Sequence, residues 1–228
     1  EWDWLKGLGQ AALKPFRGSN LNEEDETYAK LVDEGYAAAA DRVDEVGDWR
    51  RQADLDSDYL SVWDNPDGHR FVGVRGTKMD AQDLEEDLEI LQEGHPDDLI
   101  SSELRSILDH TKPGTVVDVG AHSLGTSLLT QAFEADDTLQ DRIRQSFLYA
   151  PAFTPFAKNV TETYEKDDRV RYFINLEDWV SIGDLGSSGP VNVVYRDGWT
   201  LNPLAAHSIT GWEGNLDLKE ENKPDIFS

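Results

Sequence analysis

The sequence predicts an α/β domain with a mostly parallel central sheet and helices on both faces. Short β-branched or apolar runs, typical of buried strands, alternate with segments whose apolar residues recur at helical spacing. This alternation favours a parallel sheet, because consecutive parallel strands need a crossover connection between them. The length of 228 residues fits a single domain with one sizeable core.

The first half of the chain predicts one long helix and a hairpin. Asn22 or Asp25 would cap a helix that reaches about Val46. Its apolar face would hold Tyr28, Leu31, Val32, Tyr36, Ala39, Ala40 and Val43. Two strands are predicted at 59–63 and 70–74, joined by Asp-Asn-Pro-Asp-Gly, a strong turn signal.

The second half predicts the alternating elements. Acidic residues dominate 78–93, whose few apolar side chains suit a helix packed on the sheet, and another helix is expected over 97–110. A strand over 115–119 leads into a helix that begins near Thr126. Further strands are expected at 146–149, 170–174 and 191–195.

The composition is strongly acidic. Forty-six acidic residues against 21 basic ones give a formal net charge of −25, which argues against nucleic acid as a partner. Such self-repulsion destabilises a compact domain unless salt screens it, so the charge predicts a halophilic source and leaves the compartment open. We therefore expect the melting temperature to fall on dialysis from molar salt to about 0.01 M, and equal midpoints would refute the halophile interpretation.

Other compositional features limit the classes of protein. There are no cysteines, which excludes disulfides and thiolate metal sites. No run of eighteen apolar residues occurs, so no membrane-spanning helix is expected, and no signal peptide is visible.

The chain divides into an N-terminal segment, a domain and a tail. Glu1 to Phe16 is apolar for a terminus, and it favours either a segment that docks on a protein assembly or membrane surface, or a strap on its own domain. Both interpretations stay open. The boundaries are residues 1–22 for this segment, 23–216 for the domain and 217–228 for a polar tail.

One turn carries the candidate chemistry. Between the strand at 115–119 and the following helix lie Ala121, His122, Ser123, Leu124 and Gly125. Small residues two positions either side of a serine permit a sharp strand-to-helix turn, which presents the serine at a helix N-terminus. This turn predicts a nucleophilic Ser123, and the alternative is an ordinary connection that happens to contain serine.

This turn resembles the Gly-His-Ser-Leu-Gly motif of the class-three (fungal triglyceride type) lipase family of the α/β-hydrolase superfamily. Two further blocks are similar to that family in the same order. The run from Phe71 to Thr77 resembles its strand that ends in Arg-Gly-Thr, and Asn175 to Val180 resembles its Asn-x-x-Asp-x-Val block. His207 follows. The resemblance implies an α/β-hydrolase fold over nearly the whole chain.

The resemblance also implies a site. Ser123 would be the nucleophile, His207 its base and Asp178 the partner of His207, in the order that α/β-hydrolases use. The backbone N–H groups of Thr77 and Leu124 would form the oxyanion hole. No metal or organic cofactor is implied.

Neighbouring residues compete for these roles. Asp184 is the main rival to Asp178, whereas Glu177 would point elsewhere in an extended segment. His122 is expected to be a structural residue under the turn. Thr126 replaces a glycine of the family pattern, which leaves the packing depth of the helix open.

The predicted function is a serine hydrolase that cleaves carboxylic esters through an acyl-serine intermediate. A short or soluble ester is expected, with lipid as a further substrate class, because 78–93 lacks the apolar inner face of a lid. The alternative is a lipase-fold structural or binding component of a larger assembly, such as a cell envelope or virion, docked through Glu1 to Phe16.

Overall fold

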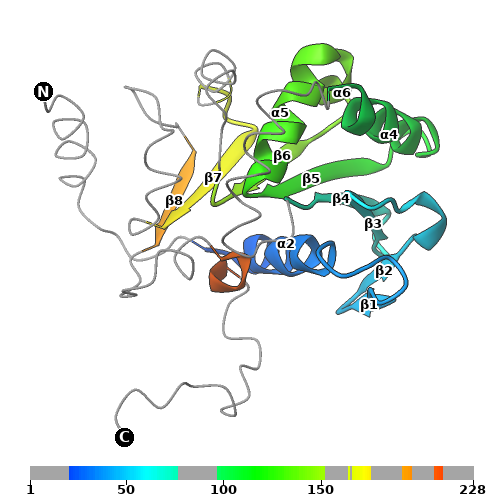
Figure 1. The fold of residues 1–228 in the computed structure, drawn as a ribbon, viewed down its shortest axis with the longest axis horizontal. Helices are drawn as coiled ribbons and strands as arrows, with labels where there is room; N and C mark the ends of the chain where they lie inside the picture. The colour runs from blue at the N-terminus through cyan, green and yellow to red at the C-terminus, as the bar shows by residue number, and fades with distance from the viewer. Residues whose placement is uncertain are drawn as a thin grey trace, which may run out of the picture.

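The computed structural model describes residues 21–76, 97–151, 164, 166–175, 192–196 and 208–212. The N-terminal segment, the acidic segment 78–93 and the polar tail lie outside these residues, so the predicted domain boundaries stay predictions. In the described residues the strands form one sheet of eight, in chain order from β1 to β8 (Figure 1). The strands are β1 (Glu45–Val46), β2 (Trp49–Arg51), β3 (Leu60–Asp64), β4 (His69–Val74), β5 (Val116–His122), β6 (Gln145–Tyr149), β7 (Val170–Asn175) and β8 (Val193–Arg196).

The sheet is antiparallel at one end and parallel over the rest. β1 to β4 pair in antiparallel fashion, and each pair from β4 to β8 is parallel. This confirms the predicted mostly parallel sheet. Parallel pairing also places the carboxyl ends of β4, β5, β6 and β7 along one edge, where open α/β sheets form their sites.

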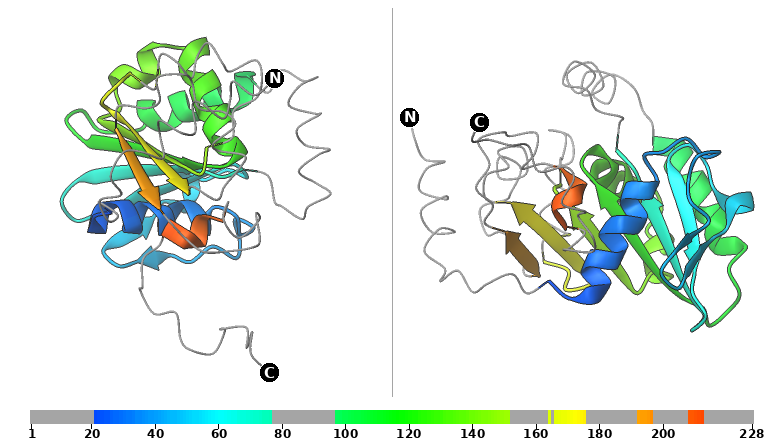
Figure 2. Two further views of the ribbon diagram at one scale, coloured as in Figure 1. Left: turned by 90° about the vertical axis from the view of Figure 1, so that its left-hand side faces the viewer. Right: turned by 90° about the horizontal axis from the view of Figure 1, so that it is seen from below.

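Helices cover both faces of the sheet, as predicted. The strand order follows the chain, so right-handed crossovers place their helices on one face. That face carries α4 (Asp97–Asp109), α5 (Leu124–Ala135) and α6 (Thr138–Asp141). The opposite face carries α2 (Glu23–Glu34) and the 3₁₀-helix η3 (Ile209–Trp212), which contact each other (Figure 2).

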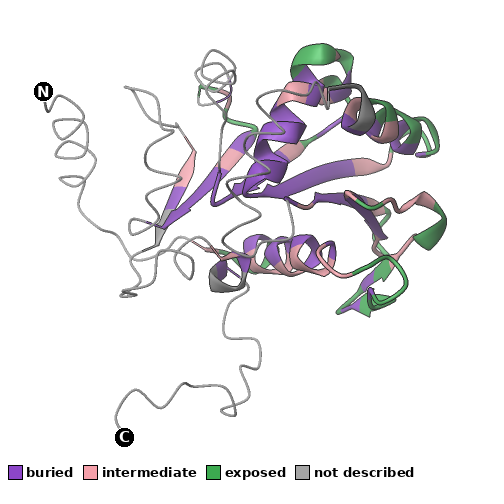
Figure 3. Ribbon diagram, in the orientation of Figure 1, coloured by how far each residue is buried: buried purple, intermediate pink, exposed green. Residues whose placement is uncertain are grey.

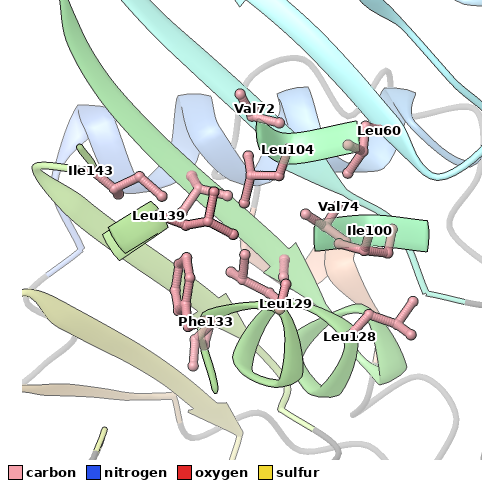
Figure 4. Packing of buried hydrophobic residues seen from close by; sticks show 14 of the residues in the cluster. Leu60, Val72, Val74, Ile100, Leu104, Leu128, Leu129, Phe133, Leu139 and Ile143 are labelled. Atoms are coloured by element: carbon pink, nitrogen blue, oxygen red, sulfur yellow. The ribbon is translucent and has the colours of Figure 1, made fainter. Parts of the chain in front are cut away.

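The face under α4, α5 and α6, called here the aliphatic face, is packed mainly by branched aliphatic side chains. Strands contribute every second residue, for example Val117, Val119 and Ala121 of β5. The helices contribute Leu104, Leu129 and others (Figure 4). Figure 3 shows that α5 is buried over most of its surface, whereas α4 is exposed on its outer side.

The opposite face, called here the aromatic face, uses rings instead. Its cluster contains Tyr28, Trp49, Trp63, Phe71, Phe147, Tyr149, Phe173 and Trp212. The ring of Tyr28 stacks on Phe71 at 4.2 Å between centroids, and the ring of Tyr149 stacks on Phe173 at 4.3 Å. Offset stacking of this kind adds about 1 kcal/mol per pair to the burial of the rings themselves.

Buried charges tie α2 to the sheet. Asp25 receives two hydrogen bonds from the guanidinium of Arg171, at 2.9 and 2.7 Å. Asp118 of β5 accepts from the hydroxyl of Tyr28 at 2.6 Å and pairs with Arg144. Asp25 also completes the predicted cap, because its side chain and that of Asn22 form a reciprocal capping box. The helix is therefore fixed in register as well as buried.

The predicted helix from Asn22 to Val46 is too long, because α2 ends at Glu34. Arg42, almost completely buried, donates to the carbonyl oxygens of Gly35 and Leu60 at 3.1 Å each. The backbone after Gly35 forms turns that these tertiary bonds hold, in place of a continued helix. Val43, predicted on the apolar face, is 43% exposed.

The other predicted elements match the described residues within one to two positions, except that β5 runs three residues further than predicted, to His122, and the following helix begins two residues early. β1, β2 and the 3₁₀-helix η1 (Ala53–Leu55) lie in the region that the overlong helix prediction partly covered. None of the described helices combines the length and apolar character needed to cross a membrane.

Candidate active site

Ser123 lies at the junction of β5 and α5 in a strained backbone conformation. Its φ is 55° and its ψ is −129°, values that non-glycine residues rarely adopt. The N-terminus of α5 begins at the next residue, so its partial positive charge points at the serine. Strand, strained serine and helix form the sharp strand-to-helix turn that the sequence predicted at this position, called here the elbow.

The elbow is held by bonds on both sides of Ser123. Its N–H donates to the carbonyl of Tyr149 at 3.1 Å, and its carbonyl accepts from the N–H of Thr126 at 3.0 Å and from the Thr126 hydroxyl at 2.6 Å. Thr126 is fully buried, so α5 accommodates it where the family pattern has glycine. The hydroxyl of Thr126 therefore adds a hydrogen bond to the carbonyl of Ser123, which stabilises the turn.

Two glycines allow the end of β4 to lie against the elbow. A Cβ on Gly125 would be 2.7 Å from the carbonyl oxygen of Val74 and 2.8 Å from that of Arg75. A Cβ on Gly76 would be 3.0 Å from the His122 carbonyl oxygen and 3.3 Å from the Leu124 nitrogen. Both contacts are with backbone, which cannot move aside easily. The strand exit at Gly76 and the elbow are therefore in direct backbone contact.

Leu124, a predicted oxyanion donor, is placed suitably for that role. It is the first residue of α5, where backbone N–H groups have no partner within the helix. Among the described residues, no hydrogen bond uses the Leu124 N–H. The second predicted donor, Thr77, lies outside the described residues.

His122 is buried at the end of β5, where it was expected as a structural residue. Its Nδ1 lies 2.6 Å from the hydroxyl oxygen of Tyr36. That hydroxyl also accepts the N–H of Gly76 at 3.0 Å. Tyr36 was predicted only as one residue of an apolar helix face. The available signal was the alternation of Asp118, Gly120 and His122 in an otherwise apolar strand, which marks a face with polar partners.

Arg75 supplies a positive charge beside the strand exit. Its guanidinium lies 4.6 Å from the ring centroid of Tyr59 and donates to the carbonyl of Gly76 at 2.9 Å. It also donates to the carbonyl of Asp58. The described residues contain no cluster of three or more side chains that would hold a metal ion.

The structure thus brings together Ser123, Leu124 and the strand exit at Gly76. Asp178, His207, Thr77 and the rival carboxylates Glu177 and Asp184 lie outside the described residues. β7, which precedes Asp178 in the sequence, ends at Asn175 on the same sheet edge as Ser123. Ser123 itself is only 1% exposed.

Comparison with known proteins finds similar folds among solved structures. No protein-family model matches the chain, and no curated protein sequence matches it. A crystal structure of Lip2 lipase from Yarrowia lipolytica is 13% identical, covers 84% of this chain and 85% of its own, and gives a TM-score of 0.48. A mutant of MDLA from Penicillium cyclopium is 17% identical, with 79% and 81% covered and a TM-score of 0.43. A further structure, described as a fungal lipase, is 15% identical, with 78% and 81% covered and a TM-score of 0.44. At these identities the similarity concerns the fold alone.

Proposed function

We propose that this protein is a serine hydrolase that cleaves carboxylic esters, with Ser123 as its nucleophile. The observation that supports this best is the strained elbow at Ser123. A positive φ at a non-glycine residue costs about 1–3 kcal/mol, and strain of this kind clusters at functional sites. The elbow suits such a reaction, because it places Ser123 at the N-terminus of α5 beside the Leu124 N–H, which has no partner in the described residues.

In the proposed mechanism, the Ser123 oxygen attacks the ester carbonyl carbon while His207 takes the hydroxyl proton. The resulting oxyanion receives hydrogen bonds from the N–H groups of Leu124 and Thr77, each worth about 3 kcal/mol in the transition state. His207 then gives the proton to the leaving alcohol, which departs as the acyl-serine forms. Water, activated by His207, hydrolyses that intermediate and restores the serine. Asp178 holds His207 in the required tautomer.

The assignment of His207 and Asp178 is supported by their order in the chain and by the fold. Parallel strands bring residues that follow β5 and β7 to one edge of the sheet. The proposed substrate is a short or soluble acyl ester, with lipid esters as the wider class.

A second candidate is a lipase-fold structural or binding component of a larger assembly, docked through Glu1 to Phe16. The observation that favours it is the almost complete burial of Ser123, because a nucleophile must meet its substrate. The fold would be the same in either case, since function resides in the site.

Labelling with a fluorophosphonate separates the two candidates. The intact protein in molar salt should be labelled at Ser123, and Ser123→Ala should abolish the labelling. Ser127→Ala, one turn further along the same helix and equally buried, is the matched control and should be labelled normally. An intact, folded protein that takes up no label would support the assembly component and overturn the hydrolase.

Two further variants test the partners of Ser123. His207→Ala should remove the labelling, because an unassisted serine hydroxyl is a weak nucleophile near neutral pH. Asp178→Asn should reduce turnover by several orders of magnitude without unfolding the protein, whereas Asp184→Asn should change it little. The opposite ranking would assign the acid to Asp184 and keep the class of enzyme.

A further inference from the structure

We propose that Tyr36 is a positioning residue whose hydroxyl holds the oxyanion side of the site against the nucleophile elbow. This inference rests on the proposed hydrolase function and concerns a residue that touches neither substrate nor reacting atoms. Tyr36 acts through two neighbours, Gly76 at the exit of β4 and His122 at the end of β5.

The hydroxyl of Tyr36 joins the two strands at the edge that carries the site. It accepts the Gly76 N–H at 3.0 Å and lies 2.6 Å from His122 Nδ1. The rings of Tyr36 and His122 meet edge to face at 5.7 Å between centroids. A Cβ on Gly76 would be 2.9 Å from the Tyr36 hydroxyl oxygen, so glycine is what lets the tyrosine reach this position.

The protonation of Tyr36 makes its hydroxyl a possible donor to His122. Burial, followed by the charge of Asp33, raises the pKa of Tyr36 above its ordinary value of 10, although Gly76 and Arg75 oppose the shift. The phenol therefore keeps its proton at neutral pH. A protonated phenol can donate to His122 Nδ1 while its oxygen accepts from Gly76, and in that arrangement the ring proton of His122 lies on Nε2.

Gly76 is held from its other side as well. Its carbonyl accepts from the guanidinium of Arg75 at 2.9 Å, and that guanidinium is stacked on Tyr59. Bonds therefore fix both the N–H and the carbonyl of Gly76, whose backbone lies against the elbow at Leu124.

The register between α2 and β5 explains why Tyr36 can do this rigidly. Tyr28 bonds to Asp118, a Cβ on Gly120 would meet Val32 at 3.0 Å, and Tyr36 bonds to His122. Four helical residues, from Tyr28 to Val32, rise about 6 Å, and two strand residues, from Asp118 to Gly120, span about 7 Å. Helix and strand thus advance in step. Tyr36 follows the C-terminal end of α2 by two residues, so the helix supports the position of its hydroxyl.

Loss of the hydroxyl should therefore impair the transition state more than substrate binding. Deleting an oxyanion donor outright costs about 10²- to 10³-fold in kcat, and loosening one should cost less. Tyr36→Phe removes only the hydroxyl, so we expect kcat to fall about 10- to 100-fold on a soluble short-chain ester such as p-nitrophenyl acetate. KM should stay within about threefold.

The matched control is Tyr28→Phe, in α2. Its hydroxyl is also buried and also bonds to β5, but at the opposite end of the sheet from Ser123. Both variants should lower the melting temperature, and only Tyr36→Phe should lower kcat. The ¹⁵N resonances of the His122 ring give a readout independent of activity, because Nδ1 should lose its hydrogen-bond partner in Tyr36→Phe and keep it in Tyr28→Phe.

The outcomes are distinguishable. If the wild type hydrolyses the ester and Tyr36→Phe keeps its kcat within twofold, the positioning role is overturned and the hydrolase stands. If both variants lower kcat equally, Tyr36 is merely structural, which also overturns the role. If the wild type neither hydrolyses esters nor takes up a fluorophosphonate, the proposed function fails, and the positioning role fails with it. A fall in kcat confined to Tyr36→Phe, with the change at His122, supports the inference.

Discussion

The two faces of the central sheet are stabilised by different physics. The aliphatic face under α4 and α5 consists mainly of branched side chains (Figure 4), and the buried hydroxyls of Thr126 and Thr130 on α5 bond to carbonyls of the same segment. The aromatic face under α2 combines stacked rings with buried carboxylates, guanidiniums and hydroxyls. Apolar packing depends on volume, whereas the polar contacts of α2 depend on each partner being present.

The difference shows which interactions set the positions of the helices around the candidate site. The site lies at the seam of the two faces, because Leu124 and Gly125 begin the helix of the aliphatic face while Tyr36 and His122 belong to the aromatic side. Close packing of apolar side chains holds α5 on the aliphatic face, whereas hydrogen bonds hold α2 in register on the aromatic face. The predictions that follow test this contrast, beginning with the largest expected effect.

Asp25→Ala should be the most damaging change. It would leave the guanidinium of Arg171 largely buried without its carboxylate, and it would also remove half of the capping box of α2. Removing one partner of a buried ion pair costs about 4 kcal/mol of unfolding free energy. Urea denaturation measures this, with Asp109→Ala as control, because Asp109 pairs with Arg142 at the surface and should cost under about 1 kcal/mol. Equal losses in the two variants would contradict the contrast.

Leu104→Ala tests the aliphatic face. The side chain is fully buried between α4 and the sheet, and its truncation should cost about 3 kcal/mol through lost burial and the cavity left behind. The loss should be the same in low and high salt, since no charge is involved. Val43→Ala, at an exposed site, should cost under about 0.5 kcal/mol in the same urea experiment. A salt-dependent loss at Leu104 would show that the faces are not independent.

Gly120→Ala tests the packing of rings against β5. An added Cβ would lie 2.6 Å from Phe71 Cζ and 3.0 Å from Val32 Cγ2, so α2 and the ring must shift. Overpacking of this kind costs about 2 kcal/mol. Combining it with Phe71→Leu, which withdraws the ring, should cost less than the sum of the two single variants. Strict additivity in a double-mutant cycle would show that the clash is not with Phe71.

Removing the hydroxyl of a buried tyrosine should change the pH dependence of the unfolding free energy, and this is the smallest effect expected at neutral pH. Burial raises the pKa of Tyr28 and Tyr149 on the aromatic face, and burial followed by the charges of Glu134 and Asp167 raises the pKa of Tyr164 to about 12. A raised pKa in the folded state means that stability is intact below the unfolded value of about 10 and is lost as pH rises through the folded value. Unfolding free energy should therefore be level up to about pH 9 and fall above pH 10.

The contrast between the two faces predicts which buried tyrosine contributes more to the loss of unfolding free energy at alkaline pH. Between pH 10 and 12 the unfolding free energy of the wild type should fall more than that of Tyr28→Phe. Tyr164→Phe should differ less from the wild type, because the phenol of Tyr164 is less deeply buried. Denaturation curves collected across this pH range measure the slopes directly. A decline that is equally steep in all three proteins would assign the alkaline loss to other groups.

Much of the fold followed from local patterns. The strands from β3 to β7, the helix α4 and the elbow around Ser123 were predictable, because each depends on residues adjacent in sequence. The cap at Asn22 is likewise a local device. The salt dependence, the docking role of Glu1 to Phe16 and the partners Asp178 and His207 remain predictions.

Other features depended on contacts between distant residues. The apolar residues keep their helical spacing past Gly35, but α2 ends at Glu34, and Arg42 bonds to the carbonyl of Leu60. The hydroxyl of Tyr36 contacts Gly76 and His122, which lie 40 and 86 positions further along the chain. The sequence by itself therefore determined the class of fold and the identity of the candidate nucleophile. The tertiary structure alone decided where α2 ends and which hydroxyl holds the site, because a hydrogen bond depends on the distance between atoms, which periodicity does not encode.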